Sequence, residues 1–238
     1  NEEGNKRYIG ENGYFAPPSG IKDSIYVYGI IRLTQDELFR QMVLTKYFSS
    51  KIDDLNIEKY EKFKNVIDLY IKEPFLREPL SNLYIRTKDK LENPHLASDA
   101  VLKKLANSSV SQIMDSIFSQ NKGNILYIDC WSTSCGPCIS EMPNSRELMK
   151  KMKGKNVSFI YLCIDSEEKT WKSWLNKLQI GGQHYLFDRK QSTDIRKSFE
   201  IKGIPFYILI DKDGSIIEKG SQIRPYKAKE KIEKLLKK

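Results

Sequence analysis

The chain has 238 residues, of which 39% are hydrophobic and 30% charged, and its formal net charge is +9. This composition provides enough apolar surface to bury a core, so it excludes an intrinsically disordered chain. The longest apolar runs, residues 159–164 and 204–210, are far shorter than the roughly 20 residues that a membrane-spanning helix needs.

The first half of the chain has the apolar spacing of amphipathic helices. Side chains recur at i and i+4 over residues 34–51, and the pattern continues over residues 57–72 and 79–91. After Asn93-Pro94, shorter helices are expected at residues 98–105 and 110–119, and residues 24–32 are compatible with a strand. We therefore expect residues 1–108 to form a mainly α-helical N-terminal domain.

The second half changes to short, nearly continuous apolar runs. Residues 125–131 and 157–164 are strand-like and flank a helical stretch, which predicts a parallel βαβ unit. Asp213-Gly214 is typical of a hairpin turn. The further expected elements are helices at 167–178, 192–199 and 225–236 and strands at 185–187, 206–210 and 215–218. Residues 109–238 are therefore expected to form an α/β domain that ends in an antiparallel hairpin and a C-terminal helix.

The positive charge lies almost entirely in this second half. Residues 1–105 carry 17 basic and 16 acidic side chains, whereas residues 106–238 carry 23 and 15. Lysines at helical spacing usually form a solvated face, and the sequence lacks the interleaved arginine and aromatic residues that stack on bases. We expect no nucleic-acid partner. Binding of this surface to an acidic protein or to lipid headgroups remains an alternative.

All four cysteines fall within 34 residues, and two of them form Cys135-Gly136-Pro137-Cys138. This motif follows a predicted strand and begins a predicted helix. The positive end of a helix dipole stabilises a thiolate there by roughly 0.3 to 2 kcal/mol. We expect Cys135 to be the attacking sulfur. Cys138, one turn further into the helix and more buried, is expected to resolve the mixed disulfide.

Three separated motifs resemble the thioredoxin superfamily, and within it the TlpA/ResA-like thiol-disulfide oxidoreductases. The motifs are residues 128–138, Glu141-Met142-Pro143 and Gly203-Ile204-Pro205-Phe206. The resemblance covers residues 110–238 and implies a thioredoxin-like fold. It also implies that residues 167–188 are the extra helix and strand of the TlpA-like branch.

The resemblance also implies roles for individual residues. Asp129 would be the buried carboxylate that exchanges a proton with Cys138, and Pro205 would be a cis-proline that lets the Ile204 backbone pair with a substrate chain. Gly136 and Pro137 would border the bound substrate, and Trp131 would either contact it or pack beneath the site. Two residues depart from the family pattern: Ser134 replaces a usual tryptophan, and Cys130 replaces an aromatic or aliphatic side chain.

Three alternative roles for the cysteines are a structural disulfide, a second redox pair and a metal cluster. A structural disulfide across a four-residue loop restrains little of the unfolded chain. Cys130 and Cys163 are expected to be buried, inert thiols, and a second redox pair between neighbouring strands is the alternative. The spacing of all four cysteines also fits a plant-type [2Fe–2S] cluster, but cluster ligands occupy a wrapping loop rather than strands. With His95 and His184 the only histidines, no metal or other cofactor is expected.

The resulting hypothesis is a thiol-disulfide oxidoreductase that reduces disulfides of envelope proteins through Cys135 and Cys138. Its expected partners are disulfide-containing protein substrates, and a membrane thiol electron donor would keep it reduced. The location in a bacterial envelope or periplasm rests on the resemblance alone. The alternative is a binding module in which the helical half docks a partner and the thioredoxin-like domain turns over little.

Overall fold

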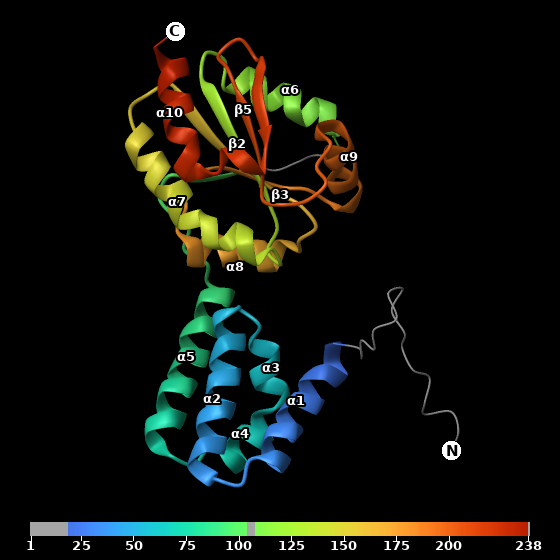
Figure 1. The fold of residues 1–238 in the computed structure, drawn as a ribbon, viewed down its shortest axis with the longest axis vertical. Helices are drawn as coiled ribbons and strands as arrows, with labels where there is room; N and C mark the ends of the chain where they lie inside the picture. The colour runs from blue at the N-terminus through green and yellow to red at the C-terminus, as the bar shows by residue number, and fades with distance from the viewer. Residues whose placement is uncertain (1–18, 104–107, 238) are drawn as a thin grey trace, which may run out of the picture. The chain divides into compact units, whose positions relative to one another are not determined.

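The computed structural model describes residues 19–103 and 108–237. The chain forms two compact units, Asn1–Lys88 and Asp89–Lys238 (Figure 1). The first unit ends 20 residues before the expected boundary at residue 108. The reason is that the segment after Lys88 contributes a strand to the sheet of the second unit.

The described part of the first unit is helical. Its elements are α1 (Ser19–Leu33), α2 (Glu37–Asp53), α3 (Ile57–Lys62), α4 (Lys64–Tyr70) and the greater part of α5 (Pro74–Glu92). Asp36 caps α2 by accepting a hydrogen bond from the Phe39 N–H at 2.7 Å. Val27, Leu44, Phe48, Ile67 and Leu80 belong to one buried core, so this unit has a hydrophobic core of its own.

Three expected elements of this unit differ from the structure. Residues 24–32 lie in helix α1 and form no strand, because tertiary burial of Val27 outweighs the strand preference of the aromatic and β-branched side chains around it. The expected helix at 57–72 is divided at Phe63 into α3 and α4. Helix α5 begins at Pro74, and Pro79 lies inside it.

The second unit contains a sheet with six strands among the described residues, in the order β1-β4-β3-β2-β5-β6. The strands are β1 (Ala100–Lys103), β2 (Ile125–Trp131), β3 (Val157–Cys163), β4 (Gly182–Leu186), β5 (Phe206–Ile210) and β6 (Ile216–Gly220). The first four strands of this order run parallel, and β5 and β6 pair antiparallel. This arrangement confirms the expected thioredoxin-like fold class.

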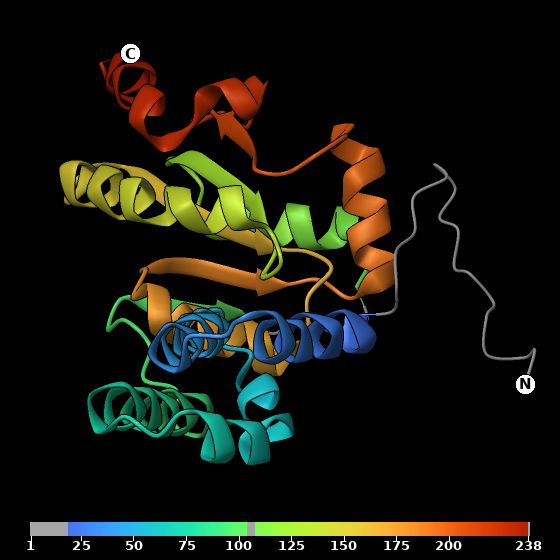
Figure 2. The same ribbon diagram turned by 60° about the horizontal axis from the view of Figure 1, so that its bottom comes forward.

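Helices cover both faces of the sheet (Figure 1). Leu126, Ile128 and Cys130 of β2 pack into a core that includes α6 (Val110–Gln120) and α9 (Arg189–Phe199). The alternate side chains face α7 (Gly136–Met152) and α10 (Pro225–Leu236), which pack against each other. Figure 2 shows α7, in yellow-green, running along the sheet. Each side chain of β2 is therefore buried, on one face or the other.

Strand β1 corrects the helix expected at residues 98–105. Ala100 pairs with Gly182 and Lys103 with Tyr185, so β1 extends the sheet beyond β4. Its pairing partner β4 lies about 80 residues further along the chain. The pairing therefore cannot be predicted from the residues next to β1. The expected inserted helix and strand at 167–188 are present as α8 (Glu168–Leu178) and β4. No helix among the described residues is long and apolar enough to cross a membrane.

Candidate active site

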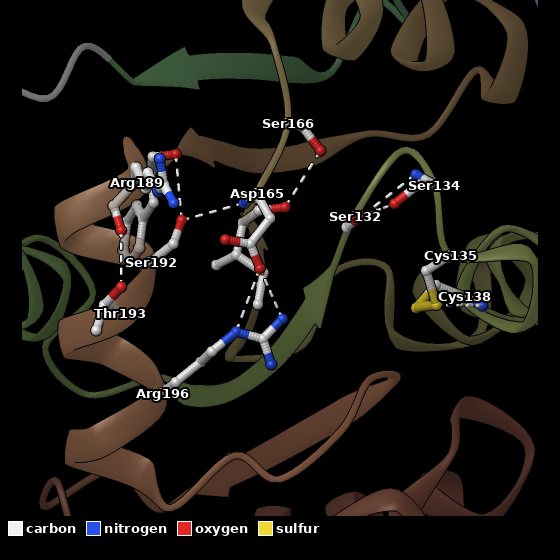
Figure 3. A network of polar contacts seen from close by, with 12 residues as sticks. Ser132, Ser134, Cys135, Cys138, Asp165, Ser166, Arg189, Ser192, Thr193 and Arg196 are labelled. Carbon is white, nitrogen blue, oxygen red and sulfur yellow. Dashed lines mark hydrogen bonds and ion pairs between the residues drawn. A yellow bond between two sulfur atoms is a disulfide. The ribbon is translucent and has the colours of Figure 1, made fainter. Parts of the chain in front are cut away.

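The two cysteines of the Cys-Gly-Pro-Cys motif lie where β2 passes into α7 (Figure 3). Cys135 is the N-cap of α7, and its Sγ accepts a hydrogen bond from the Cys138 N–H at 3.2 Å. The two cysteines form a disulfide. Cys135 is partly exposed, whereas Cys138 is 1% exposed. An incoming molecule can therefore reach Cys135 but not Cys138.

The Ile204–Pro205 loop lies beside this motif. The peptide bond between the two residues is cis. Because β2 and β5 run antiparallel with Cys130 opposite Phe206, the residues just before β5 adjoin the end of β2 from which the cysteine loop departs. Pro205 is buried, and Ile204 is partly exposed. The sequence motif and the cysteines thus meet at one end of the sheet.

Asp129 is buried in a layer of aromatic side chains. It is 1% exposed, and the register places Tyr161 and Tyr207 on either side of it. Neither of its carboxylate oxygens has a hydrogen-bond partner among the described residues. Burial raises the pKa of the Asp129 carboxyl well above its usual range, and the nearby Glu141 carboxylate raises that pKa further. Asp129 is therefore a buried group that favours holding a proton.

Glu141 is a further candidate functional residue, and the sequence motifs did not predict a role for it. It follows Cys138 by three residues on α7 and is 8% exposed. Its carboxylate accepts hydrogen bonds from Arg224 Nη1 at 2.8 Å and from Asn144 Nδ2 at 3.0 Å. The i, i+3 spacing from Cys138 places both side chains on one helix face, and this spacing is the signal that would have found it.

Trp131, Gly136 and Pro137 occupy different depths. Trp131 is 0% exposed, and its indole Nε1–H has no partner among the described residues. Its side chain therefore lies beneath the site, as expected for a core residue, and the expected substrate contact is not available to it. Gly136 and Pro137 are exposed at the start of α7. These two residues border the surface around Cys135.

Polar contacts hold the cysteine loop to its neighbours. Figure 3 shows the contacts of Asp165 with Ser192 and Arg196. The Ser166 hydroxyl accepts hydrogen bonds from the Thr133 N–H at 3.0 Å and the Thr133 hydroxyl at 3.1 Å. Asp165, in the left-handed region with φ +53°, donates its N–H to the Ser192 hydroxyl at 3.1 Å and pairs with Arg196 at 2.7 Å. The loop after β3 thus links α9 to the residues just before Cys135. Nothing in the sequence pattern indicated this network.

The other two cysteines do not join the site. Cys130 lies opposite Leu162 and Cys163 opposite Trp131, so the one-residue offset points the two thiols to opposite faces of the sheet. Both are free and buried, which overturns the second redox pair. Burial raises the pKa of both thiols, that of Cys163 to about 12. The four cysteines therefore do not converge on a cluster, and among the described residues no group of three His, Cys, Asp or Glu side chains is placed to hold a metal ion.

Comparison with known proteins finds similarity over the second half of the chain. Residues 123–216 match the family model described as "Thioredoxin-like". This match assigns residues 123–216 to a thioredoxin-like domain. It is 28% identical over 155 residues to the thiol-disulfide oxidoreductase ResA of Bacillus thuringiensis subsp. konkukian, covering 65% of this chain and 83% of that protein. Over 117 residues it is 33% identical to ResA of Bacillus anthracis, covering 49% of this chain and 64% of that one.

Two solved structures are similar to about half of the chain. The solution structure of a putative thiol-disulfide oxidoreductase from Bacteroides vulgatus is 37% identical, with coverage of 50% of this chain and 78% of that chain and a TM-score of 0.45. A thiol:disulfide interchange protein from Bacteroides sp. is 24% identical, with coverage of 50% and 77% and a TM-score of 0.46. The thioredoxin-like chain described here is a thiol-disulfide oxidoreductase related to ResA.

Proposed function

We propose that this oxidoreductase reduces disulfides in partner proteins, and that Cys135 and Cys138 carry the two electrons. The observation that carries the proposal is the asymmetry of the pair. Cys135 is partly exposed at the N-terminal end of α7, and Cys138 is buried one turn below it. One sulfur is accessible for attack, and the other can act only within the protein.

In the first step, the Cys135 thiolate attacks one sulfur of a substrate disulfide. A mixed disulfide forms, and the second substrate sulfur leaves as a thiolate. The N-terminal end of α7 stabilises the attacking thiolate through its dipole and through the Cys138 N–H, which points at Cys135 Sγ. This stabilisation increases the fraction of Cys135 that is present as the nucleophilic thiolate.

In the second step, Cys138 attacks Cys135 Sγ and releases the remaining substrate thiolate. The two protein sulfurs are then joined, as they are in this structure, and two electrons have passed to the substrate. Cys138 must lose a proton to attack. Asp129 is the proposed acceptor, because burial raises the pKa of its carboxyl and so makes its carboxylate form a stronger base than an exposed carboxylate. Glu141, held by Arg224, supports this role because its charge raises the pKa of Asp129.

The substrate chain is proposed to lie against the Ile204–Pro205 loop. Ile204 is partly exposed next to the cysteine loop, and its backbone can pair with an extended peptide. Gly136 and Pro137 form the opposite border. Ser134 is exposed in this rim, so the surface before Cys135 is small and polar.

We place the reaction in a bacterial envelope or periplasm, where partner proteins carry disulfides, and propose a membrane thiol as the electron donor. The support is the relationship to ResA and the need of any such reductant for a source of electrons. The proposal involves no metal or organic cofactor, because the dithiol itself holds both electrons.

The test is reduction of insulin by the purified full chain with dithiothreitol as the electron source. Cys135→Ser is expected to lower the rate to that of dithiothreitol alone, because the attacking sulfur is gone. Cys138→Ser is expected to accumulate a mixed disulfide with substrate, visible as a species of higher mass on a non-reducing gel. Cys163→Ser is the matched control and should leave the rate within about twofold.

Full insulin reductase activity in Cys135→Ser would contradict the proposal. Equilibration with glutathione then measures the reduction potential of the Cys135–Cys138 pair, which distinguishes a reductant from an oxidant. When both thiols react, about 30 mV corresponds to a tenfold change in the equilibrium constant. A potential near that of strong oxidants would assign net electron flow in the opposite direction.

A docking role for the helical unit is a second candidate. Helix α2 exposes Leu38, Phe39 and Met42, and α1 exposes Ile21 and Ile25. Single exposed apolar side chains are ordinary on proteins, but five on two consecutive helices favour contact with another protein. This candidate does not compete with the redox chemistry, because its residues lie in the other unit.

A further inference from the structure

A pocket lies towards the opposite end of α7 from the dithiol. There, a pocket of about 400 Å³ forms where α7 ends and the turn into β3 begins, bounded on its other side by the turn that leads from α8 into β4. We call it the basic pocket. The residues of α7 that line the pocket, from Arg146 to Met152, follow Cys135 by 11 to 17 positions, which corresponds to roughly 17 to 26 Å along the helix. Its volume lies within the range of small-molecule sites in proteins, about 300 to 1,000 Å³.

The floor of the basic pocket is apolar. It is lined by Met149 and Met152 of α7 and by Val157 and Phe159 of β3. Met152 and Phe159 are buried, whereas Met149 and Val157 are partly exposed. Methionine side chains adapt to ligands of different shape, so this floor suits a flexible hydrocarbon chain.

The rim of the basic pocket is cationic. Arg146, Lys150, Lys153 and Lys155 line it, with Asp99 as the only carboxylate among its lining residues. The lining therefore carries four positive charges and one negative charge.

The rim cations differ in how far they are already engaged. Lys150 is paired with Glu147 at 2.8 Å, and Lys155 approaches Glu233 at 3.8 Å. Lys153 is exposed and forms no ion pair with a described residue. A ligand anion would supply the missing partner.

Asp99 does not fill the place of that anion. Its carboxylate lies against Gly181, where an added Cβ would meet the carboxylate atoms at 2.3 to 2.4 Å. It is thus on the β1–β4 side of the pocket, whereas the four cations come from α7 and the turn that follows it. Lysines at a helix C-terminus also stabilise the helix dipole, but that role requires no cavity and no apolar floor.

We propose that the basic pocket binds an anionic amphiphile, an alkyl chain that carries a phosphate or carboxylate group. The hydrocarbon chain covers Met149, Met152, Val157 and Phe159, and the anion lies beside Lys153. The same chemistry is offered by a free alkyl phosphate or fatty acid and by the headgroup region of an anionic bilayer. Binding is independent of the dithiol, and the redox state of Cys135 does not enter it.

The test is calorimetric titration of the full chain with decyl phosphate below its micelle concentration. Butyl phosphate and inorganic phosphate are titrated in parallel. One decyl phosphate is expected to bind per chain. Butyl phosphate should bind at least tenfold more weakly, because each buried methylene contributes up to about a fourfold gain in affinity. Inorganic phosphate should bind more weakly still.

Lys153→Glu and Lys151→Glu form a matched pair. Both lysines are exposed, they lie two residues apart, and each change alters the net charge by the same amount, but only Lys153 lines the pocket. Lys153→Glu should weaken decyl phosphate binding at least tenfold through loss of a charge-assisted contact, and Lys151→Glu less than twofold. Insulin reduction should stay unchanged in both variants, which also shows that they fold.

Equal weakening in the two variants would overturn the proposal, because the effect would then be one of general surface charge. Equal affinity for decyl phosphate and inorganic phosphate, or no binding of either, would overturn it as well. Vesicles identify the source of the ligand. Sedimentation with phosphatidylglycerol vesicles but not with phosphatidylcholine vesicles, lost only in Lys153→Glu, assigns the site to a bilayer headgroup, whereas decyl phosphate binding without sedimentation assigns it to a free amphiphile.

Discussion

Asp129 combines two features that usually exclude each other, because it is ionisable and yet has no polar partner among the described residues. The Tyr161 and Tyr207 hydroxyls donate no hydrogen bond to its carboxylate, and the Glu141 carboxylate repels a negative charge there. A proton on Asp129 is therefore favoured in the folded chain far more than in the unfolded chain. This difference links the stability of the protein to pH.

Asp129→Asn is predicted to make the protein more stable than the wild type at high pH, because the variant lacks the titration that lowers the wild-type free energy of unfolding there. Because the pKa of Asp129 is raised on folding, the unfolded chain releases this proton first, and the wild-type free energy of unfolding falls as pH rises from about 4 towards the raised pKa. Asparagine leaves an equally unpartnered polar group but no titration. The variant should therefore be the more stable protein at pH 8, with no such advantage at pH 4, in urea unfolding.

The same variant is predicted to lose the proton acceptor of the resolving step. Release of substrate from the mixed disulfide should slow roughly 100-fold, the lower end of what positioned acid–base groups contribute. Rapid-mixing kinetics with a fluorescent disulfide peptide measures that step separately from the first attack. An unchanged release rate would remove Asp129 from the mechanism while leaving the roles of the cysteines intact.

At the scale of elements, β4 is held close to β3 at Gly182. This residue has φ +90°, and a Cβ on it would lie 2.8 Å from the Phe159 carbonyl oxygen. The sheet therefore requires glycine here for two reasons, backbone conformation and close packing. Gly214 in the hairpin turn has the same φ of +90° but nothing within 4 Å of a Cβ.

Gly182→Ala and Gly214→Ala are predicted to separate these two reasons. Both variants should lose about 1 kcal/mol or more of stability from the left-handed conformation. Gly182→Ala should lose at least about 1 kcal/mol beyond that, because β3 and β4 must move apart. Denaturant midpoints of the two proteins measure the difference, and equal losses would show that the contact with Phe159 relaxes without cost.

The elements that could be predicted from the sequence are those whose signals are local. The apolar runs of β2 and β3 and the turn at Asp213-Gly214 identify the sheet, and Cys135 could be placed at a helix start from its neighbours alone. Strand β1 could not be predicted, because its four residues acquire a strand conformation only by pairing with β4. The same holds for the site: Arg224 reaches Glu141 across 83 positions of sequence. Contacts of this kind depend on the topology of the sheet, which cannot be predicted from a short segment of the sequence.

At the scale of the whole molecule, each unit buries a core of its own. The helical unit encloses Phe48 and Leu44, whereas the sheet unit encloses the side chains of β2, β3 and β5. The described part of the redox machinery, from Asp129 to Arg224, lies entirely in the second unit. The chemistry and any docking by the helices are therefore separable by truncation.

A chain of residues 89–238 is predicted to fold cooperatively and to reduce insulin within about twofold of the full chain. A shorter chain, residues 106–238, lacks β1 and exposes the edge of β4, so its thermal midpoint should be at least about 4 °C lower. Calorimetry and insulin turnover check both. Failure of residues 89–238 to fold would show that the two units depend on each other. If this truncated chain turned over a native partner at an unchanged rate, that result would argue against a docking role for the helices.

The place of β1 in the sheet also has a mechanical consequence. The chain that leaves the helical unit enters the sheet through this short edge strand, which is separated from β3 by one strand and from β2 by two. Tension on the N-terminal side therefore acts first on the four-residue ladder between β1 and β4. That ladder can open while the central strands stay paired, since edge elements open at lower free energy than a core. Opening of β1 would therefore leave unchanged the pairing of β2 with β3 and β5, from which the dithiol loop departs.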